Sequence, residues 1–524
     1  MRTALRPKAP RAQVVEVFSA PAPIGGWNAK DAAASMPITD AFKLINWFPT
    51  TTEVVLRGGQ VDYATTITGT VETLAVYKDM DGSEQMFAVT DTDIYDVTNP
   101  DVASAESATI TDGKCQYVNF GDGTNNWVIM VNGVNDPLYY DGTTWTRVDE
   151  LTSPALTGYT GDAVENFIHI NEYKGRLFFI EKDTLSFWYL PAGAAGGALI
   201  EFDLSSLASL GGYLMWAGTW SFDSGDGPDD AIVFMTSKGQ AIVYRGTDPS
   251  TAAAWTLTGV YYLGEPLGRR SFVNYGGDLI AITQEGAFPL SKSLTSANID
   301  PSVAITDKIN GAFNKATRTY GDNFGWEATL YQTQTALVFN IPVSSTISKQ
   351  YVMNTITQAW CEFDSWNAAC FAVYNKQLYY GGVGVVQKGW SGLSDADTEI
   401  TAIGKTAFSY FGNTSQLKRF NFFRPLLQIS GSLIFNTGMD TDFSDKTITG
   451  TSTYTANSTD VWDTGKWDSA KWAGSTQASD VVRQWSSPAN NVGYCASGGI
   501  KVNVKGLSIH WQASDFVYEH GGIL

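Results

Sequence analysis

Residues 73–90, TLAVYKDMDGSEQMFAVT, contain the pattern that decides the fold of this 524-residue chain. Two short apolar runs, Thr73 to Tyr77 and Met86 to Thr90, flank the dipeptide Asp81-Gly82. Runs of about five such residues are typical of β-strands, and a glycine between them supplies the positive φ angle of a tight turn. The stretch therefore predicts a β-hairpin.

The same arrangement returns along most of the chain. Asp-Gly turns recur at residues 112–113, 122–123 and 141–142, and no helical pattern of about 12 residues separates the strand-like runs. This predicts an all-β fold and argues against alternating β-α-β units. The further strand-like runs are residues 127–131, 176–180, 231–235, 240–244, 278–282 and 377–380.

A second repeat has a longer period. Lys174-Gly175, Gly276-Gly277 and Asn375-Lys376 each precede a run in which leucine is followed by apolar or aromatic residues. Their starts lie about 100 residues apart, or two blades of a β-propeller whose repeat is about 40–50 residues. One four-stranded blade cannot bury both of its faces, so blades pack around an axis. We expect a β-propeller-like main domain of about five to seven blades over residues 53–412.

The two ends of the chain differ from this central region. Residues 1–52 are irregular and open with basic residues, prolines and alanines, which predicts an extended N-terminal arm that contacts a neighbouring protein. Near residues 415–419 the chain becomes briefly polar and basic, and the strands beyond lack blade-like spacing. We therefore expect a C-terminal, β-sandwich-like domain over residues 413–524.

Composition and charge bound the class of protein. Apolar residues make up 44% of the chain and charged residues 17%, as in globular proteins. The net charge of −19 repels phosphates, which argues against tight nucleic-acid binding but suits a passage in which DNA slides. The sequence has no signal peptide and no apolar run of about 18 residues. We expect a soluble, cytosolically made protein without a membrane span.

Residues that could carry catalysis are few and scattered. Neither the histidines nor the cysteines have the spacing of a zinc site or of a disulfide framework, and no phosphate-binding loop motif is present. We expect His169 to be a structural strand residue and the Cys361 and Cys370 thiols to pack as small apolar groups. We also expect no catalytic residue, no cofactor and no enzyme activity. The full set is His169, His510, His520, Cys115, Cys361, Cys370 and Cys495.

One acidic loop is a weak candidate for calcium binding. Asp223, Asp226, Asp229 and Asp230 place four carboxylates in eight residues, although without EF-hand spacing. The alternative that we favour is a solvated loop. The same alternatives apply to the acidic segment 91–96, in which strand alternation alone would place its first two aspartates on one face.

Three tryptophans, Trp462, Trp467 and Trp472, recur at intervals of five residues. This interval fits neither one face of a strand nor one face of a helix, so turns would have to present them. Their wide apolar faces suit glycan stacking or contact with a partner protein, although we favour packing in a core or interface. Residues 141–145, DGTTW, weakly resemble the turn of sialidase blades, which keeps a carbohydrate-active propeller as a minor alternative.

Six stretches distributed over the chain form a further pattern. They are residues 22–28 (APIGGWN), 353–382, 417–420 (LKRF), 424–425 (RP), the Trp-Asp repeat at 462–472, and 509–522. Together they resemble tail-region structural proteins of short-tailed bacteriophages (podoviruses). Within that group the best match is the tail nozzle, also called tail tubular protein B. The chain is much shorter than the better-known nozzle proteins.

This resemblance implies a structural virion protein of the viral tail, made in the host cytoplasm and without catalytic residues. It implies a propeller-bearing subunit of a sixfold ring, a hexamer below the adaptor that surrounds the DNA exit channel. Its partners would be adaptor or portal-side proteins, distal tail proteins, and double-stranded DNA that passes during DNA ejection without tight binding. The alternatives are a receptor- or glycan-binding tail component and, less favoured, a carbohydrate-active propeller enzyme.

Overall fold

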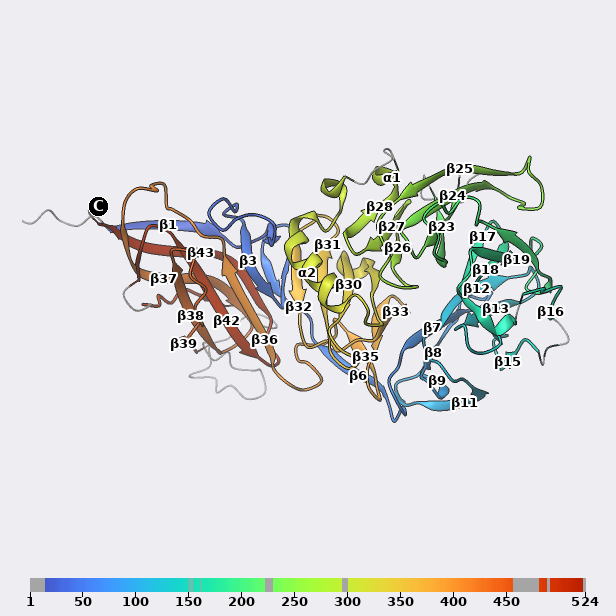
Figure 1. Cartoon of the computed structure of the whole chain (residues 1–524). Coiled ribbons are helices and arrows are strands. Elements are labelled where there is room, and N and C mark those ends of the chain that lie inside the picture. The colour runs from blue at the N-terminus through green and yellow to red at the C-terminus, as the bar shows by residue number, and fades with distance from the viewer. Residues whose placement is uncertain are drawn as a thin grey trace, which may run out of the picture. The chain divides into compact units, whose positions relative to one another are not determined.

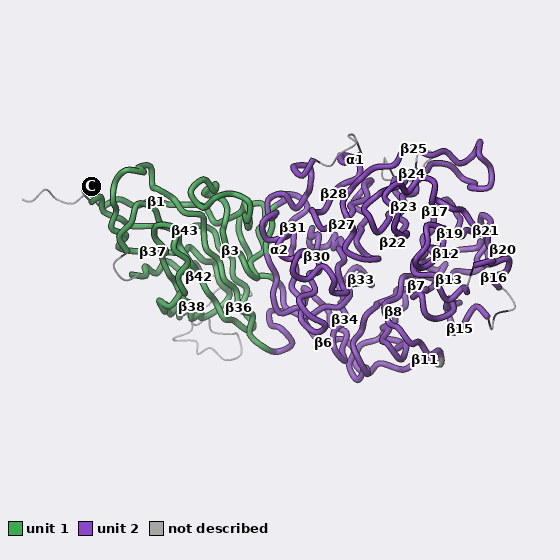
Figure 2. Tube along the Cα trace, viewed as in Figure 1, with its two compact units in different colours: residues 1–57, 359–361, 398–524 green, residues 58–358, 362–397 purple. Residues whose placement is uncertain are grey.

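The chain folds into two compact units (Figure 2). Unit 1 contains residues 1–57, 359–361 and 398–524, and unit 2 contains residues 58–358 and 362–397. A computed structural model describes residues 15–149, 151, 154–161, 163–221, 230–294, 300–455, 480–487 and 491–521.

Unit 2 is a β-propeller with seven blades in its described residues (Figure 1). The first blade consists of β7 (Thr73–Lys78), β8 (Glu84–Val89), β9 (Asp93–Asp96) and β11 (Ser104–Thr109), and the second of β12 (Gln116–Gly121), β13 (Asn126–Val131), β14 (Leu138–Tyr140) and β15 (Trp145–Arg147). The third consists of β17 (Phe167–Tyr173), β18 (Arg176–Glu181), β19 (Ser186–Tyr189) and β21 (Ile200–Asp203). The fourth consists of β22 (Leu214–Trp220), β23 (Ala231–Thr236), β24 (Gln240–Gly246) and β25 (Trp255–Tyr262). The last three are β26 (Phe272–Tyr275), β27 (Asp278–Thr283) and β28 (Gly286–Pro289); β29 (Glu327–Tyr331), β30 (Ala336–Pro342) and β31 (Ser348–Asn354); and β33 (Cys370–Tyr374), β34 (Gln377–Gly381), β35 (Val386–Gly389) and β6 (Gln60–Thr65).

The propeller closes through strands from both ends of its sequence. β6, which precedes the first blade, pairs antiparallel with β35 and so becomes the outer strand of the seventh blade. Contacts then run from blade to blade, and β33 of the seventh blade contacts β7 of the first. The predicted all-β, propeller-like fold is therefore confirmed, with a blade number at the upper end of the predicted range.

Each innermost strand contributes to two hydrophobic cores. On β7, Leu74 and Val76 pack in the core between the first and seventh blades, whereas Ala75 and Tyr77 pack in the core between the first and second blades. Because side chains alternate along a strand, both faces of the sheet are buried without any helix. The same alternation explains why these strands read as continuous apolar runs.

The predicted turns mostly join strands within a blade. Gly82, Gly123 and Gly142 have φ angles of 84°, 85° and 96° and lie in hairpins. Lys174-Gly175, Gly276-Gly277 and Asn375-Lys376 join the first two strands of the third, fifth and seventh blades, so the spacing of two blades is confirmed. Asp112-Gly113 differs, because it connects β11 of one blade to β12 of the next.

Position 113 requires glycine because the backbone of Thr90 lies close to it, and not because the chain has a positive φ angle there. A Cβ at this position would lie 2.8 Å from the backbone carbonyl carbon of Thr90. The Asp112 carboxylate accepts a hydrogen bond from the Lys114 backbone N–H at 2.9 Å, which shapes the connection locally. The hairpin predicted at residues 112–113 was therefore wrong.

Unit 1 consists of two β-sheets that pack face to face. A β-carbon on Gly498 would lie 2.2 Å from the Phe423 ring, and one on Gly404 would lie 2.6 Å from the Trp511 ring. Glycine thus lets the aromatic side chains of one sheet contact the backbone of the other. The first sheet contains β1 (Val15–Pro21), β43 (Ile509–His520), β37 (Lys418–Ile429), β40 (Asp480–Val482), β41 (Asn491–Gly493), β5 (Val54–Leu56) and β4 (Trp47–Pro49). The second contains β2 (Gly26–Trp27), β3 (Asp40–Ile45), β36 (Ile400–Thr406), β42 (Ala496–Val504), β38 (Leu433–Thr441) and β39 (Gly450–Tyr454).

The two units do not coincide with the three segments expected from the sequence. Residues 15–52 contain strands that belong to unit 1, because β1 pairs along its whole length with β43, from Val15 opposite Glu519 to Pro21 opposite Ala513. Likewise, residues 398–412 belong to unit 1, since β36 pairs with β42. The propeller is thus inserted between two parts of one β unit.

Helices are short in the described chain. α2 (Asn310–Tyr320) is the longest at 11 residues, and α1 (Leu290–Ser293) is a single turn. Among the described residues, no helix has the length and apolar character that crossing a membrane requires.

Candidate functional site at the centre of the propeller

A cavity of about 220 Å³ lies where the innermost strands of five blades begin. We call it the central cavity. It is lined by Thr73 and Leu74 of the first blade, Gln116 and Tyr117 of the second, Arg270 and Phe272 before and on β26, Glu327 to Thr329 of the sixth, and Cys370 and Phe371 of the seventh. Charged side chains therefore meet at one end of the propeller axis.

Arg270 connects several blades at this end. Its guanidinium donates hydrogen bonds to the Glu72 carbonyl oxygen (2.9 Å), the Thr73 hydroxyl (2.5 Å) and the Cys115 carbonyl oxygen (2.8 Å). The same group lies 3.5 Å from Glu327 Oε2. Arg270 precedes the fifth blade, so this one side chain holds together parts of the first, second, fifth and sixth blades.

Glu327 is the buried partner of Arg270. It begins β29, and its Oε1 accepts a hydrogen bond from the Phe371 backbone N–H of the seventh blade. Burial raises the pKa of Glu327 to about 7, although Arg270 and the Phe371 N–H act in the opposite direction. The carboxyl group is thus closely packed and partly protonated near neutral pH.

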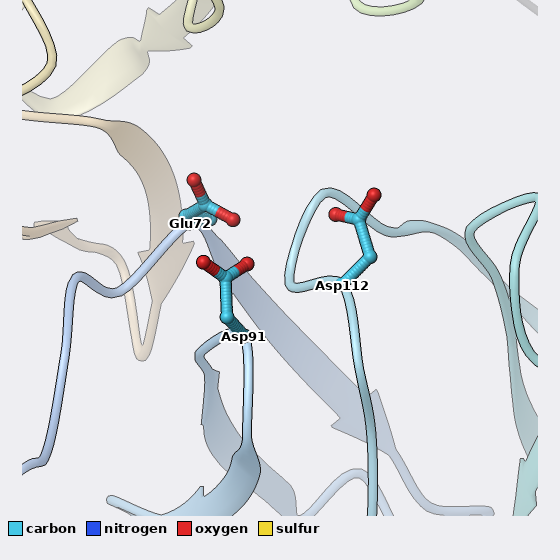
Figure 3. Close-up of side chains that lie close together, drawn as sticks. All are labelled: Glu72, Asp91 and Asp112. Atoms are coloured by element: carbon cyan, nitrogen blue, oxygen red, sulfur yellow. The ribbon is translucent and has the colours of Figure 1, made fainter.

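Three carboxyl groups gather beside this cluster (Figure 3). Ligand atoms of Glu72, Asp91 and Asp112 all lie within 4.8 Å of one another, and the Glu72 and Asp91 carboxyl groups face each other in the view. Glu72 precedes β7, Asp91 lies in the turn from β8 to β9, and Asp112 lies between the first two blades. The Lys114 ammonium is 3.9 Å from Glu72 Oε1.

The negative charge of these three carboxyl groups is only partly compensated by their neighbours. Burial, and then the neighbouring Asp91, raises the pKa of Glu72 to about 7. The hydrogen bond from Glu72 lowers the pKa of Asp91. Glu72 therefore holds a proton toward Asp91, and Lys114 supplies a positive charge. Three carboxyl groups offer at most six oxygens, and calcium takes about six to eight.

The structure describes only some of the residues singled out from the sequence. Trp462, Trp467, Trp472, Asp223, Asp226 and Asp229 are outside the described residues. Asp230 is buried directly before β23, and its backbone carbonyl accepts a hydrogen bond from the Tyr173 hydroxyl at 2.6 Å. In the acidic segment 91–96, Asp91 belongs to the cluster of three carboxyl groups beside the central cavity.

The histidine and cysteine predictions are confirmed. His169 is buried in β17, where burial lowers its pKa to about 3, and its Nδ1 accepts a hydrogen bond from the Ala217 N–H. All four cysteines are buried thiols that form no disulfide. Burial raises the pKa of the Cys370 thiol to about 12, so it packs as an apolar group.

Arg270, Glu327 and Glu72, the charged residues that meet at the centre, were not predicted from the sequence. Arg269-Arg270 is the only pair of adjacent arginines in the sequence, and it directly precedes a strand-like run. That dipeptide was the available signal. Its partners Glu72 and Cys115 are 198 and 155 residues away, so no local pattern connects them.

Comparisons with known proteins add the following findings. No protein-family model and no curated protein matches the chain. Among solved structures, the extracellular domain of the hybrid two-component system BT3049 from B. thetaiotaomicron aligns with a TM-score of 0.40 and 11% identity, over 63% of this chain and 41% of that one. The β-propeller domain of Cps50 (Swd1) from Myceliophteria thermophila aligns with a TM-score of 0.39 and 10% identity, over 63% of this chain and 98% of that one. Sqt1 from Saccharomyces cerevisiae aligns with a TM-score of 0.37 and 10% identity, over 64% of this chain and 99% of that one.

Proposed function

We propose that this chain is a non-enzymatic structural subunit of a short bacteriophage tail, which assembles into a nozzle-like ring around the DNA exit channel. The observation that carries the non-enzymatic part is the use of charge at the centre of the propeller. The Arg270 guanidinium is engaged by oxygen atoms of neighbouring blades, and Glu327 by a backbone N–H. Charged groups used in this way hold blades together and leave little for a substrate.

The tail assignment is supported by the sequence resemblance, which extends over both units. Residues 353–382 run from the end of β31 through β34 in the propeller region, and residues 509–522 include β43 of unit 1. A ring subunit must resist deformation, and a closed propeller, in which the faces of neighbouring blades cover one another, suits that demand.

DNA would pass between subunits and not through a single propeller. The central cavity of about 220 Å³ holds only a few water molecules, and Arg270 crosses it. A channel enclosed by several copies would be acidic overall, since the chain carries a net charge of −19. Repulsion from such a wall would keep DNA mobile within the Debye length of about 8–10 Å.

Electron microscopy of the purified protein and of virus particles tests this proposal. We expect sixfold rings in negative-stain images, and density for the chain between the adaptor and the tip of the tail. A stable monomer or trimer that binds cell-surface glycan would instead support the receptor-binding alternative. Hydrolysis of cell-wall or capsule sugars would overturn the non-enzymatic assignment.

A further inference from the structure

A groove runs along the propeller end that holds Arg270. It consists of two adjoining pockets of about 460 and 330 Å³, which share Lys114, Asp322, Asn323 and Phe324. One pocket extends to Tyr213 beside the fourth blade, and the other extends to Val383 after β34 of the seventh blade. The groove is therefore elongated and crosses several blades.

Arg269 provides an incompletely used cation in the groove. Within the described chain its guanidinium makes one hydrogen bond, from Nη1 to the Asn132 carbonyl oxygen at 3.0 Å, and no carboxylate lies within 4 Å. Asp112 and Asp183 act on it only at longer range. A guanidinium has five N–H donors, so most of its donors are available to a ligand. Carboxylates are the protein groups that match this fork.

Apolar side chains stand exposed along the same groove. Phe324 is 37% exposed, Ile347 54% and Val383 58%, which is unusual for large apolar residues clustered around one depression. The Lys114 ammonium lies 5.4 Å from the centre of the Phe324 ring. Arg269 thus lies toward one end of the groove, and apolar side chains lie along it. The other charged residues of its lining have both signs: Lys114, Arg270, Glu72, Asp112 and Asp322.

We propose that this groove binds an extended peptide segment of a partner protein. A carboxylate of the segment pairs with Arg269, and its apolar side chains pack on Phe324, Ile347 and Val383. A glycan is the poorer fit, because sugar recognition uses flat aromatic faces with many polar partners, whereas Ile347 and Val383 are aliphatic. The proposal is independent of ring formation.

The test uses the full chain and a random heptapeptide display library, with selected peptides measured by fluorescence polarisation. We expect selected peptides to carry Asp or Glu beside apolar residues. Because hydrogen bonds to charged groups contribute about 1.5–3 kcal/mol, Arg269→Gln should weaken binding about tenfold or more. Replacing the acidic residue of the peptide by its amide should do the same.

Matched variants separate binding from folding. Arg147→Gln is the control for Arg269→Gln, since Arg147 also donates to one backbone carbonyl, that of Thr109, but lies on the outer strand β15. Val383→Asp should also abolish binding, whereas Val102→Asp, at a residue 69% exposed on β10 (Asp101–Val102), should leave it within twofold.

Three outcomes would overturn the proposal. They are a selection that enriches no peptide, enriched peptides that lack acidic residues, and equal affinity for the wild type and both groove variants. Glucuronate or galacturonate could also displace the bound peptide at a concentration at which chloride, the control for ionic strength, does not. That result would identify the ligand as an acidic sugar and not a peptide.

Discussion

Replacing Arg270 by methionine should destabilise the propeller strongly, because one side chain connects four blades. Methionine retains much of the side-chain volume but removes all hydrogen-bond donors. The carbonyl oxygens of Glu72 and Cys115 and the hydroxyl of Thr73 then lose their partner, and the buried Glu327 loses its cation.

The magnitude follows from these contacts. Three hydrogen bonds from a charged donor contribute about 1.5 kcal/mol each, or about 4–5 kcal/mol together. Loss of the Glu327 ion pair adds only about 1 kcal/mol at pH 7, because the pKa of Glu327 is already about 7 and the carboxyl group can take up a proton. The expected loss, about 5 kcal/mol, is a large part of the stability of a typical domain.

Urea unfolding at pH 7, followed by tryptophan fluorescence, measures this loss, with Arg147→Met as the control. The control should lose less than about 1 kcal/mol, since Arg147 is only half-buried and makes one hydrogen bond to a backbone carbonyl. Arg270→Met/Glu327→Gln should be more stable than Arg270→Met alone, because no uncompensated carboxylate remains. An Arg270→Met protein within about 1 kcal/mol of the wild type, with an unchanged urea slope, would refute the role assigned to Arg270.

Three further predictions concern other buried groups. The pKa of Glu72 is raised from 4.5 to about 7 in the folded state, so its contribution to the free energy of unfolding is present below pH 4.5 and is lost as pH rises through 7. The free energy of unfolding of Glu72→Gln should therefore rise by up to about 3 kcal/mol relative to that of the wild type between pH 4.5 and 8, as measured by urea unfolding at each pH. The pKa of His169 is lowered from 6.5 to about 3, so its contribution to the free energy of unfolding is present above pH 6.5 and is lost as pH falls. His169→Asn should therefore reduce the fall in the free energy of unfolding between pH 6.5 and 4.5 by about 2–3 kcal/mol. The same pH dependence in the variant and the wild type would contradict the burial of His169 as a neutral group. Phe187 is fully buried and stacks on Phe234 with ring centres 4.4 Å apart; Phe187→Ala should cost about 3–5 kcal/mol in thermal or urea unfolding, and a loss below about 1 kcal/mol would show that this core between the third and fourth blades adapts to the cavity.

The propeller could be predicted from the sequence because its information is local. A hairpin such as residues 73–90 contains both of its strands and its turn, and side-chain alternation within one strand specifies both buried faces. The repeat at residues 174, 276 and 375 then gives the spacing of blades. The hairpin and the alternation need only a few tens of residues, and the repeat is visible because the same short pattern returns along the sequence.

The unit boundaries and the central cluster could not be predicted in this way. β1 pairs with β43 near the opposite end of the sequence, so residues 15–52 look irregular when read alone. Arg270 meets groups that are more than 150 residues distant, and nothing near Glu72 or Cys115 marks them as its partners. Residues that attract attention by composition, such as the tryptophans of 462–472, carry no such positional information.

The pairing of β1 with β43 has a consequence for biosynthesis. The strand formed by residues 15–21 is synthesised about 490 residues before its partner, residues 509–520. At about 5–20 residues per second, the interval is about 25–100 seconds. During that time the blades can fold in order, since their strands are adjacent in sequence, while β1 and its exposed Val15 and Val17 remain unpaired. The sheet of unit 1 that holds β1 and β43 is therefore completed only after the propeller sequence has been translated.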